Sequence, residues 1–360
     1  MNKFALIAKI LIILGVVFIV GSCSIFNYKI GAVSKSDEIK EIIVESGDTY
    51  MSISKKLKDN NLIKSEFYFK LYVKLTKPKK LEMGKYELSE NMGVKKIIEI
   101  LEKGSNYNPD TVSITFKEGL NVRQVIKLIT ENTNNKEEDI YNLLNDEKYL
   151  DELINNYWFI TDEIKNKEIY YSLEGYLFPD TYSFTKDMDI KQIFKRMLDN
   201  MEVKIEPYKK QIEDSKYSFH EIITLASIVE LEGSNASDRG GVAGVFYNRL
   251  ENNWSLGSDM TTYYAIKVDD YAGYELWQKE LDDKNAYNTR VTDGSMNGKL
   301  PVSAICNPGI ESIEAAINPT KHNYFYFVAD KNKKTYFQST YQEFSNKIAE
   351  LKNSGLWYTY

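Results

Sequence analysis

In the run of residues 226–250 an apolar, helix-like segment carries the carboxylate of Glu230 directly into a polar, glycine-rich turn. Glu230 lies at the edge of an apolar stripe formed by four residues with helical spacing: Ile222, Leu225, Ala226 and Val229. Desolvation disfavours the charged form of a carboxyl group. We therefore expect Glu230 to keep a proton near neutral pH and to donate it as a general acid.

A second carboxylate, Glu232, flanks the other edge of the same stripe, so periodicity alone does not choose between the two. Gly233 is typical of a helix end and would leave Glu232 the more exposed of the pair. The plainer alternative is that both side chains only solvate a helix flank, because perturbed carboxylates are the minority at helix edges.

Five sequence blocks together resemble the endolytic murein transglycosylases, the MltG or YceG-like family. Besides the Glu230 segment they are SLEGYLFPDTYSF from Ser172, LGSDMTTYYAI from Leu256, YNTR from Tyr287 with NPG from Asn307, and AAINPTKHNYFYFVAD from Ala315. Their order and approximate spacing agree with the family pattern and cover most of residues 116–346. By this resemblance Glu230 is the catalytic acid. Two departures are KLPVSAI at 299–305, where the family often has GLPPGPI, and Tyr336, where relatives commonly carry histidine.

The resemblance implies a lytic transglycosylase that cleaves the MurNAc–GlcNAc bond within nascent glycan strands and so limits their elongation. Ordinary glycosidases use two carboxylates. Here the nucleophile is the substrate's own C6 hydroxyl, so a single Glu230 can protonate the glycosidic oxygen and then accept the hydroxyl proton. Attack by a tethered hydroxyl gains a high effective molarity. The expected product carries a 1,6-anhydro-MurNAc end.

Polar and aromatic residues within the matching blocks are candidates for lining the glycan groove. They are Glu174, Asp180, Glu232, Asn248, Asp259, Tyr287, Asn288 and Thr289. A structural role is the alternative for each of them: residues 179–181 could form a turn, and Asn248 with Arg249 could brace a helix.

Two other functions remain open on sequence grounds. One is a non-catalytic peptidoglycan-binding scaffold that recruits wall synthases. The other is a water-using muramidase, which would need a second carboxylate such as Asp259 or Glu174 to activate water. The presence of Glu230 in a matching block favours the transglycosylase.

Composition bounds these hypotheses. A chain of 360 residues is typical of two domains, and a formal net charge of -6 with interspersed lysines gives no basic stripe for nucleic acid. The two cysteines, Cys23 and Cys306, are not expected to pair, and Cys306 is predicted to be a buried structural residue. HEIIT from His220 lacks the second histidine of a zinc motif. No cofactor or metal is implied.

The N-terminus is typical of a membrane element. Residues 1–9 form a short tail with Lys3 and Lys9, residues 10–26 are apolar, and residues 27–40 form a linker. We expect a single-pass anchor in the cytoplasmic membrane with an extracytoplasmic body. The alternative is a lipoprotein signal, with Cys23 acylated after the small residues that precede it.

For the fold we predict the α+β class. Residues 41–106 resemble a LysM domain, with a turn at 46–48, a helix beginning near Tyr50 and an insertion over 67–82. Residues 107–360 form the larger mixed catalytic domain, with its catalytic helix near 221–232. The run NYFYFVAD at 323–330 predicts a buried strand. Expected partners are peptidoglycan strands, the cytoplasmic membrane and peptidoglycan synthases.

Overall fold

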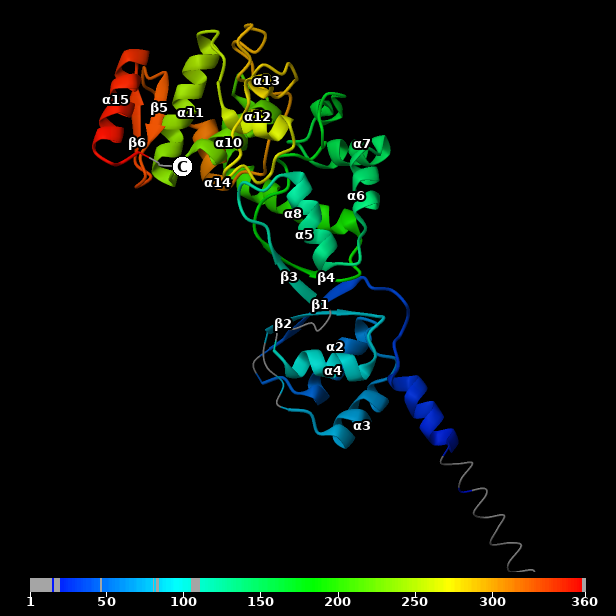
Figure 1. The fold of residues 1–360 in the computed structure, drawn as a ribbon. Coiled ribbons are helices and arrows are strands. Elements are labelled where there is room, and N and C mark those ends of the chain that lie inside the picture. Colours follow the sequence, from blue (N-terminus) through cyan, green and yellow to red (C-terminus); the bar gives the residue numbers. More distant parts are fainter. Residues whose placement is uncertain are drawn as a thin grey trace, which may run out of the picture. The chain divides into compact units, whose positions relative to one another are not determined.

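The computed structural model describes residues 15, 20–45, 47–79, 81, 84–104 and 111–357. It divides into two compact units, an N-terminal unit (Met1–Thr111) and a C-terminal unit (Val112–Tyr360) (Figure 1). The boundary predicted between residues 106 and 107 falls outside the described residues. Helices and small sheets are mixed throughout, as the α+β prediction requires.

The N-terminal unit is built around one antiparallel strand pair. Its elements are a helix over residues 20–30, then β1 (Ile39–Val44), α2 (Tyr50–Asp59), α3 (Glu66–Thr76), β2 (Gly84–Ser89) and α4 (Val94–Glu102). β1 pairs with β2 in a register that runs from Ile39 opposite Ser89 to Val44 opposite Gly84. Ile42, Ile53 and Ile97 belong to the core that the helices and this sheet share.

Local signals predicted α2 well but missed α3. The α2 helix begins at Tyr50 because the Thr49 hydroxyl accepts the Ser52 N–H and the Ser52 hydroxyl accepts the Thr49 N–H, a reciprocal cap. The stretch treated as an insertion forms α3, whose Phe69 and Val73 are buried in the core. Two helices, α2 and α3, therefore lie between the two strands of this unit.

The predicted anchor over residues 10–26 lies largely outside the described residues. Among the residues that are described, no helix is both long enough and apolar enough to cross a membrane.

The C-terminal unit is mainly helical. In chain order its elements are β3 (Thr111–Thr115), α5 (Val122–Asn132), α6 (Glu137–Leu144), α7 (Glu147–Asn156), β4 (Thr181–Thr185), α8 (Ile190–Ile205), α9 (Lys209–Glu213), α10 (Phe219–Glu232), α11 (Ala236–Glu251), α12 (Asp259–Ala265), α13 (Gln278–Leu281), α14 (Ile310–Ile317), β5 (Tyr326–Ala329), β6 (Thr335–Gln338) and α15 (Tyr341–Asn353). β3 pairs with β4, and β5 pairs with β6.

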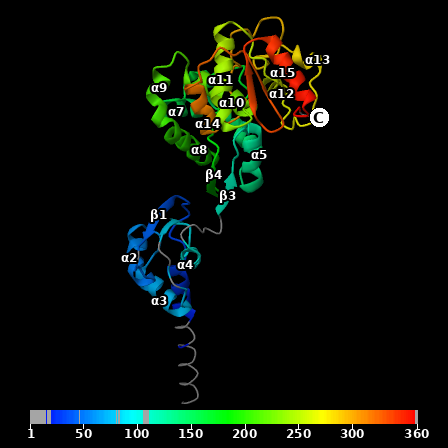
Figure 2. The same cartoon turned by 90° about the vertical axis from the view of Figure 1, so that its left-hand side faces the viewer.

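The central helix of this unit is α10, which packs against α11 and α14 (Figure 2). It begins where Ser218 and Glu221 form a capping box, and every residue from Ile222 to Val229 is buried. It ends where the Gly233 N–H donates to the Val229 carbonyl. The helix predicted over 221–232 is thus confirmed, although its residues from 222 to 229 are buried on every side of the helix and not only along one stripe.

Glycines in α11 let a distant segment approach the helix backbone. A Cβ atom added to Gly241 would lie 2.5 Å from Cζ of Phe337, and one added to Gly244 would collide with the Thr320 carbonyl oxygen. The polar, glycine-rich stretch after Glu230 is therefore a second packed helix, and its glycines serve close packing.

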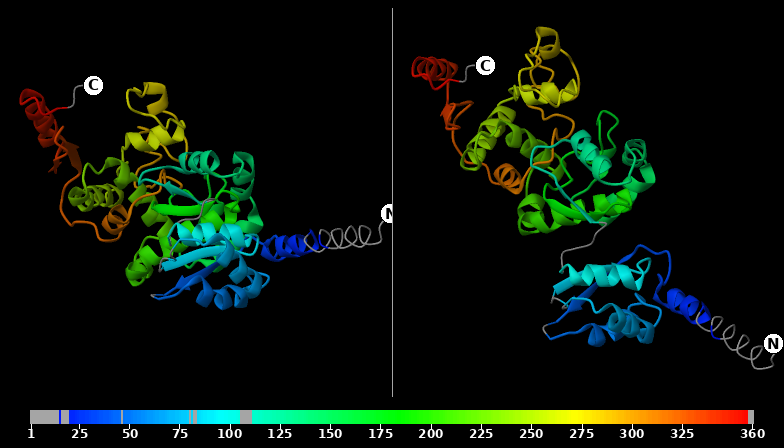
Figure 3. Two further views of the ribbon diagram at one scale, coloured as in Figure 1. Left: turned by 90° about the horizontal axis from the view of Figure 1, so that it is seen from below. Right: turned by 60° about the horizontal axis from the view of Figure 1, so that its bottom comes forward.

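The prediction of a buried strand over 323–330 is wrong in part. β5 covers only Tyr326–Ala329, and all four residues are partly exposed. The reason is that β5 belongs to a two-stranded sheet with β6, in which Tyr326 lies opposite Gln338, and it contacts α11 and α15. Figure 3 shows this pair and α15, coloured orange to red, at one end of the C-terminal unit.

Candidate active site

Three donors from two neighbouring helices surround the Glu230 carboxylate. Arg239 Nη2, in the first turn of α11, lies 2.7 Å from Oε1 of Glu230. At the start of α14, the Gly309 N–H and the Ser312 hydroxyl donate to Oε2 at 3.0 and 2.8 Å. Only 6% of the Glu230 side chain is exposed. The side chain is buried as predicted, but its surroundings are donors and not the apolar stripe that we expected.

Arg239 lies among three carboxylates. Beyond Glu230, its Nη2 is 3.8 Å from Oε2 of Glu118, and its Nη1 is 4.0 Å from Oε2 of Glu311. Only 12% of the Arg239 side chain is exposed, and its Nε has no hydrogen-bond partner among the described residues. The guanidinium is thus a buried positive centre in an acidic cluster.

Glu118 lies on the loop after β3 and contacts the same guanidinium nitrogen as Glu230. The Gly119 N–H donates to the Asn307 carbonyl at 3.0 Å, which fixes this loop against the segment that leads into α14. A Cβ atom on Gly309 would collide with the Glu118 carboxylate. Burial, with the charges of Glu230 and Glu311, raises the pKa of Glu118, although Arg239 acts in the opposite direction.

Glu232 and Asp259 form a second polar group near the end of α10. The Ser258 hydroxyl donates to Oε1 of Glu232 at 2.7 Å, and burial raises the pKa of Glu232. Asp259 is half exposed and pairs with Arg290, with 3.1 Å between Oδ1 and Nε. These two predicted substrate-binding residues therefore lie close together.

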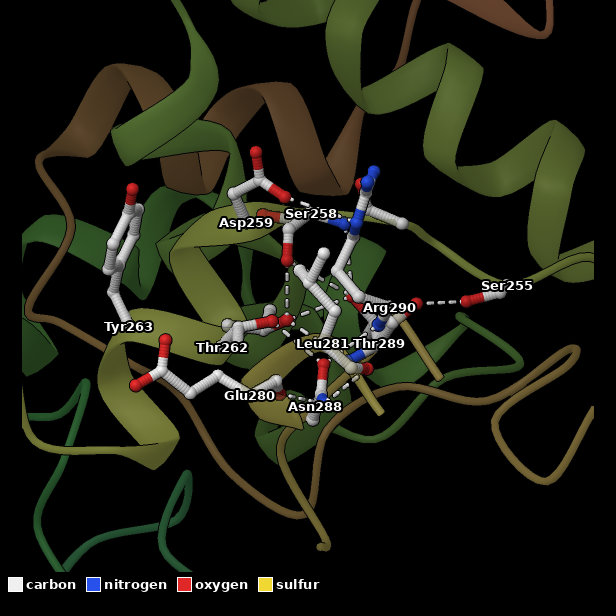
Figure 4. A network of polar contacts seen from close by, with 12 residues as sticks. Ser255, Ser258, Asp259, Thr262, Tyr263, Glu280, Leu281, Asn288, Thr289 and Arg290 are labelled. Carbon is white, nitrogen blue, oxygen red and sulfur yellow. Dashed lines mark hydrogen bonds and ion pairs between the residues drawn. The ribbon is translucent and has the colours of Figure 1, made fainter. Parts of the chain in front are cut away.

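The three residues of the YNT sequence are fully buried and bonded within the fold. Asn288 donates to the carbonyls of Glu280, Leu281 and Asp283 and accepts from Thr262 (Figure 4). The Thr289 hydroxyl accepts the Ser258 N–H at 3.0 Å. The Tyr287 hydroxyl accepts the Tyr170 N–H and contacts the Ser303 hydroxyl at 2.9 Å.

Such contacts hold the loop region between α11 and α14 in place. In this conformation the side chains of Tyr287, Asn288 and Thr289 have no exposed surface. Their residue types indicated a polar site, but the structure uses those polar groups to satisfy buried backbone atoms.

Glu174, Asn248 and Asp180 are separate from the cluster around Arg239. Glu174 is 1% exposed and accepts the Val122 N–H at the start of α5 and the Tyr264 hydroxyl at 2.8 Å. Burial raises the pKa of Glu174 to about 8. Asn248 donates to the carbonyls of His322 and Tyr324. It therefore braces the end of α11, which was the structural alternative to substrate binding. Asp180 is exposed and accepts from Asn200 at 3.0 Å.

The structure therefore adds residues that the sequence did not single out. The cluster around Glu230 also contains Glu118, Arg239, Glu311 and Ser312. Cys306 lies outside this cluster. It is buried and donates to the Ser227 carbonyl, as a structural residue would. Two signals were available: Arg239 lies in the same sequence block as Glu230, and the Glu118–Gly119 pair directly follows a strand.

Comparison with known proteins decides the family. Residues 42–350, which include every member of this cluster, match the YceG-like family. The chain belongs to that family. The match also spans most of the N-terminal unit, so both units fall within the YceG-like sequence pattern.

Relatives with names and one solved structure agree with this assignment. An endolytic murein transglycosylase of Bacillus subtilis (strain 168) is 34% identical over 312 residues, which are 86% of this chain and 83% of the relative. The protein of that name from Streptococcus pneumoniae serotype 2 (strain D39) is 29% identical over 87% of this chain, which spans only 58% of that longer relative. The crystal structure of a YceG-like protein from Listeria monocytogenes, 32% identical, superposes with a TM-score of 0.60 and covers 87% of this chain and 100% of its own.

Proposed function

We propose that this YceG-like protein is an endolytic peptidoglycan lytic transglycosylase. It cleaves the MurNAc–GlcNAc bond within nascent glycan strands, leaves 1,6-anhydro-MurNAc ends and limits strand elongation. The names of the similar proteins support the reaction class. The observation that carries the proposal for this chain is the Glu230 carboxylate, nearly buried and met by three donors.

Glu230 acts first as the acid in this proposal. It transfers its proton to the glycosidic oxygen as the bond from C1 of MurNAc to that oxygen breaks. Negative charge then develops on the Glu230 carboxylate, where Arg239, the Gly309 N–H and the Ser312 hydroxyl already point. Donors placed in advance where charge develops lower the barrier without reorganisation.

The second half of the reaction regenerates Glu230. The C6 hydroxyl oxygen of the same MurNAc bonds to C1, and its proton passes to the Glu230 carboxylate. One proton leaves Glu230 and one returns, so water is not consumed. Since the nucleophile is part of the substrate, its approach costs little entropy.

Glu230 needs a proton to donate, and in this proposal Glu118 is the residue that holds it in the resting site. Glu118 and Glu230 contact the same Arg239 nitrogen, and one guanidinium cannot neutralise two carboxylates. The negative charge of Glu230 disfavours a second negative charge on Glu118 beside it. The raised pKa of Glu118 fits this arrangement. Glu118 therefore holds its proton to higher pH than an ordinary glutamate does, and in the proposed cycle this proton passes to Glu230 before Glu230 donates it to the glycosidic oxygen.

If the protein were instead a water-using muramidase, its second carboxylate would be neither Asp259 nor Glu174. Asp259 pairs with Arg290 and Glu174 is sealed against α5, whereas Glu118 faces the group that holds Glu230. A water-using enzyme would therefore use Glu118 as its base, and its products would carry reducing ends. The non-catalytic scaffold alternative predicts no products at all.

The remaining parts of the proposal concern location and partners. The apolar run at 10–26 anchors the protein in the cytoplasmic membrane with its body outside, the alternative being acylation of Cys23. The order β1, α2, α3, β2 and α4 of the N-terminal unit is compatible with a LysM-like module, whose role is either glycan binding or that of a spacer or docking unit. Partners are glycan strands and peptidoglycan synthases, with no role for nucleic acid.

The experiment that tests this function follows strand length during digestion. Purified protein is added to long, uncrosslinked glycan strands, and the products are sized over time. An endolytic enzyme produces intermediate lengths early, whereas release of only terminal disaccharides would contradict internal cleavage. Glu230→Gln should be inactive. Glu314→Gln, which changes an exposed carboxylate on α14, the helix whose start supplies the Gly309 and Ser312 donors, should act like the wild type.

A further inference from the structure

The helix over residues 20–30 is fixed against α3 in the N-terminal unit. The Phe26 ring stacks on Tyr72 with 6.5 Å between centroids and meets Tyr68 edge-on at 6.1 Å. Lys64 Nζ, just before α3, donates to the Tyr28 carbonyl at 3.2 Å and lies over the Tyr28 ring. The two helices thus present one continuous surface.

An open apolar groove of about 520 Å³ runs between these helices. Among the residues that line it are Ile25 and Phe26 from the first helix and Phe67, Leu71 and Leu75 from α3. Phe67 and Leu75 are 68% and 66% exposed, and Ile25 is 54% exposed. Contiguous apolar surface of this kind marks an interaction site, because isolated soluble domains avoid it. We name these five residues the apolar face.

Positive charge lies at the C-terminal end of α3, next to Leu75 of the apolar face. Lys74 lies in the last turn of α3 and Lys77 is its C-cap, and both are exposed. Lys79 follows two residues later and is also exposed. Across residues 64–80 the sequence holds six lysines and one acidic residue, Glu66, which pairs with Lys70. Apolar side chains with a lysine rim are the pattern of a surface that lies in the headgroup layer of an anionic bilayer.

We propose that the apolar face and its lysines lie in the interface of an anionic lipid bilayer. The chain itself points to this partner, because the apolar run at 10–26 leads directly into the helix that forms half of the groove. A second copy of the protein fits less well, since two such faces would bring their lysine rims together. The inference rests on the membrane location proposed above and is independent of the catalytic proposal.

Depth-dependent fluorescence quenching tests this on the full chain in vesicles that contain phosphatidylglycerol. Leu75→Cys, in a Cys23→Ser background, carries an environment-sensitive dye on the apolar face. Glu87→Cys in the same background is the matched control, because Glu87 is exposed on β2 and Figure 1 shows β1 and β2 at the opposite end of this unit from α3. Cys306 is buried and should not react.

We expect nitroxides on the lipid chains to quench the dye at position 75 several-fold more than the dye at position 87. Lys74→Gln with Lys77→Gln should reduce that difference, whereas Lys85→Gln on β2 should not. Phosphatidylcholine vesicles should also give a smaller difference, because the lysines then lack anionic partners.

A third labelled protein separates this inference from the anchor. The dye on the native Cys23, which is exposed, reports whether the N-terminal segment enters the bilayer. Quenching at 23 but equal quenching at 75 and 87 would overturn the inference and leave the anchor standing. Quenching at none of the three would overturn both. Protection of position 75 from aqueous quenchers without lipid quenching would also overturn it, in favour of contact between protein copies.

Discussion

Arg239 and Glu230 form a nearly buried ion pair, with 2.7 Å between Nη2 and Oε1, that joins the first turn of α11 to the last turn of α10. Breaking a buried pair from one side leaves an unpaired charge, which costs about 3 to 5 kcal/mol. The two carboxylates that remain near Arg239 are more exposed, so they cannot take the place of Glu230. The pair therefore contributes to stability, in addition to the catalytic role that we propose for Glu230.

Arg239→Gln should destabilise the C-terminal unit by about 3 kcal/mol and abolish most activity. All four tryptophans lie in this unit, so tryptophan fluorescence during urea unfolding reports it separately from the N-terminal unit. Glu230→Gln in the Arg239→Gln background should cost less than it does alone, because neither charge is then left unpaired. Additive effects would show that the two groups are not coupled.

Glu118→Gln should slow cleavage by about 100-fold at neutral pH, the usual scale for a lost proton-transfer group. Since the pKa of Glu118 is raised, its proton is kept below that raised value and lost above it. Wild-type kcat/KM should therefore fall on the alkaline side, and this limb should move or vanish in the variant.

Glu311→Gln is the matched control for Glu118. Its carboxylate also faces Arg239 and is about as exposed as that of Glu118, but it lies 4.0 Å from Nη1, whereas Glu118 and Glu230 both lie near Nη2. Because Glu311 does not share the guanidinium nitrogen that contacts Glu230, the pH profile of Glu311→Gln should stay within about twofold of the wild type. Equal effects of the two variants would assign Glu118 only a general electrostatic role.

Glu174→Gln should change how stability depends on pH. The native pKa of Glu174 is raised to about 8 from an ordinary 4.5, so the folded state binds this proton more tightly than the unfolded chain does. The stabilisation is complete below pH 4.5 and is lost as pH rises through 8. Relative to Glu174→Gln, the wild type should lose free energy of unfolding between pH 5 and 8, and parallel curves would contradict this.

Asn288→Ala should destabilise the C-terminal unit without changing KM. The substitution removes three donated hydrogen bonds and leaves the carbonyls of Glu280, Leu281 and Asp283 without them, a loss of about 2 kcal/mol or more. Urea unfolding measures the loss. A raised KM with unchanged stability would instead make Asn288 a substrate ligand, as its sequence block suggested.

The sequence predicted elements better than it predicted the site. The α10 helix could be predicted from a capping box and an apolar run, which are both local signals. The partners of Glu230 could not be predicted in this way. Gly309 and Ser312 lie about 80 residues away, and five α-helices, α5 to α9, lie between Glu118 and α10. Helical periodicity carries no information about contacts of that separation.

The same limit explains the polar residues of the YNT sequence. Their types indicated hydrogen bonding, and they do form hydrogen bonds, but with buried backbone groups of their own unit. Only the folded chain shows which polar groups are used internally. The β5 strand was likewise predicted as buried from its aromatic residues, although a two-stranded sheet leaves those residues partly exposed.

Mass spectrometry of the strand ends tests the central claim most directly. Wild-type protein and Glu230→Gln are incubated with uncrosslinked glycan strands, and the new ends are identified by mass. We predict 1,6-anhydro-MurNAc ends from the wild type and no new ends from Glu230→Gln. Reducing ends from the wild type would show that water is the nucleophile, and unchanged cleavage by Glu230→Gln would show that Glu230 is not the acid.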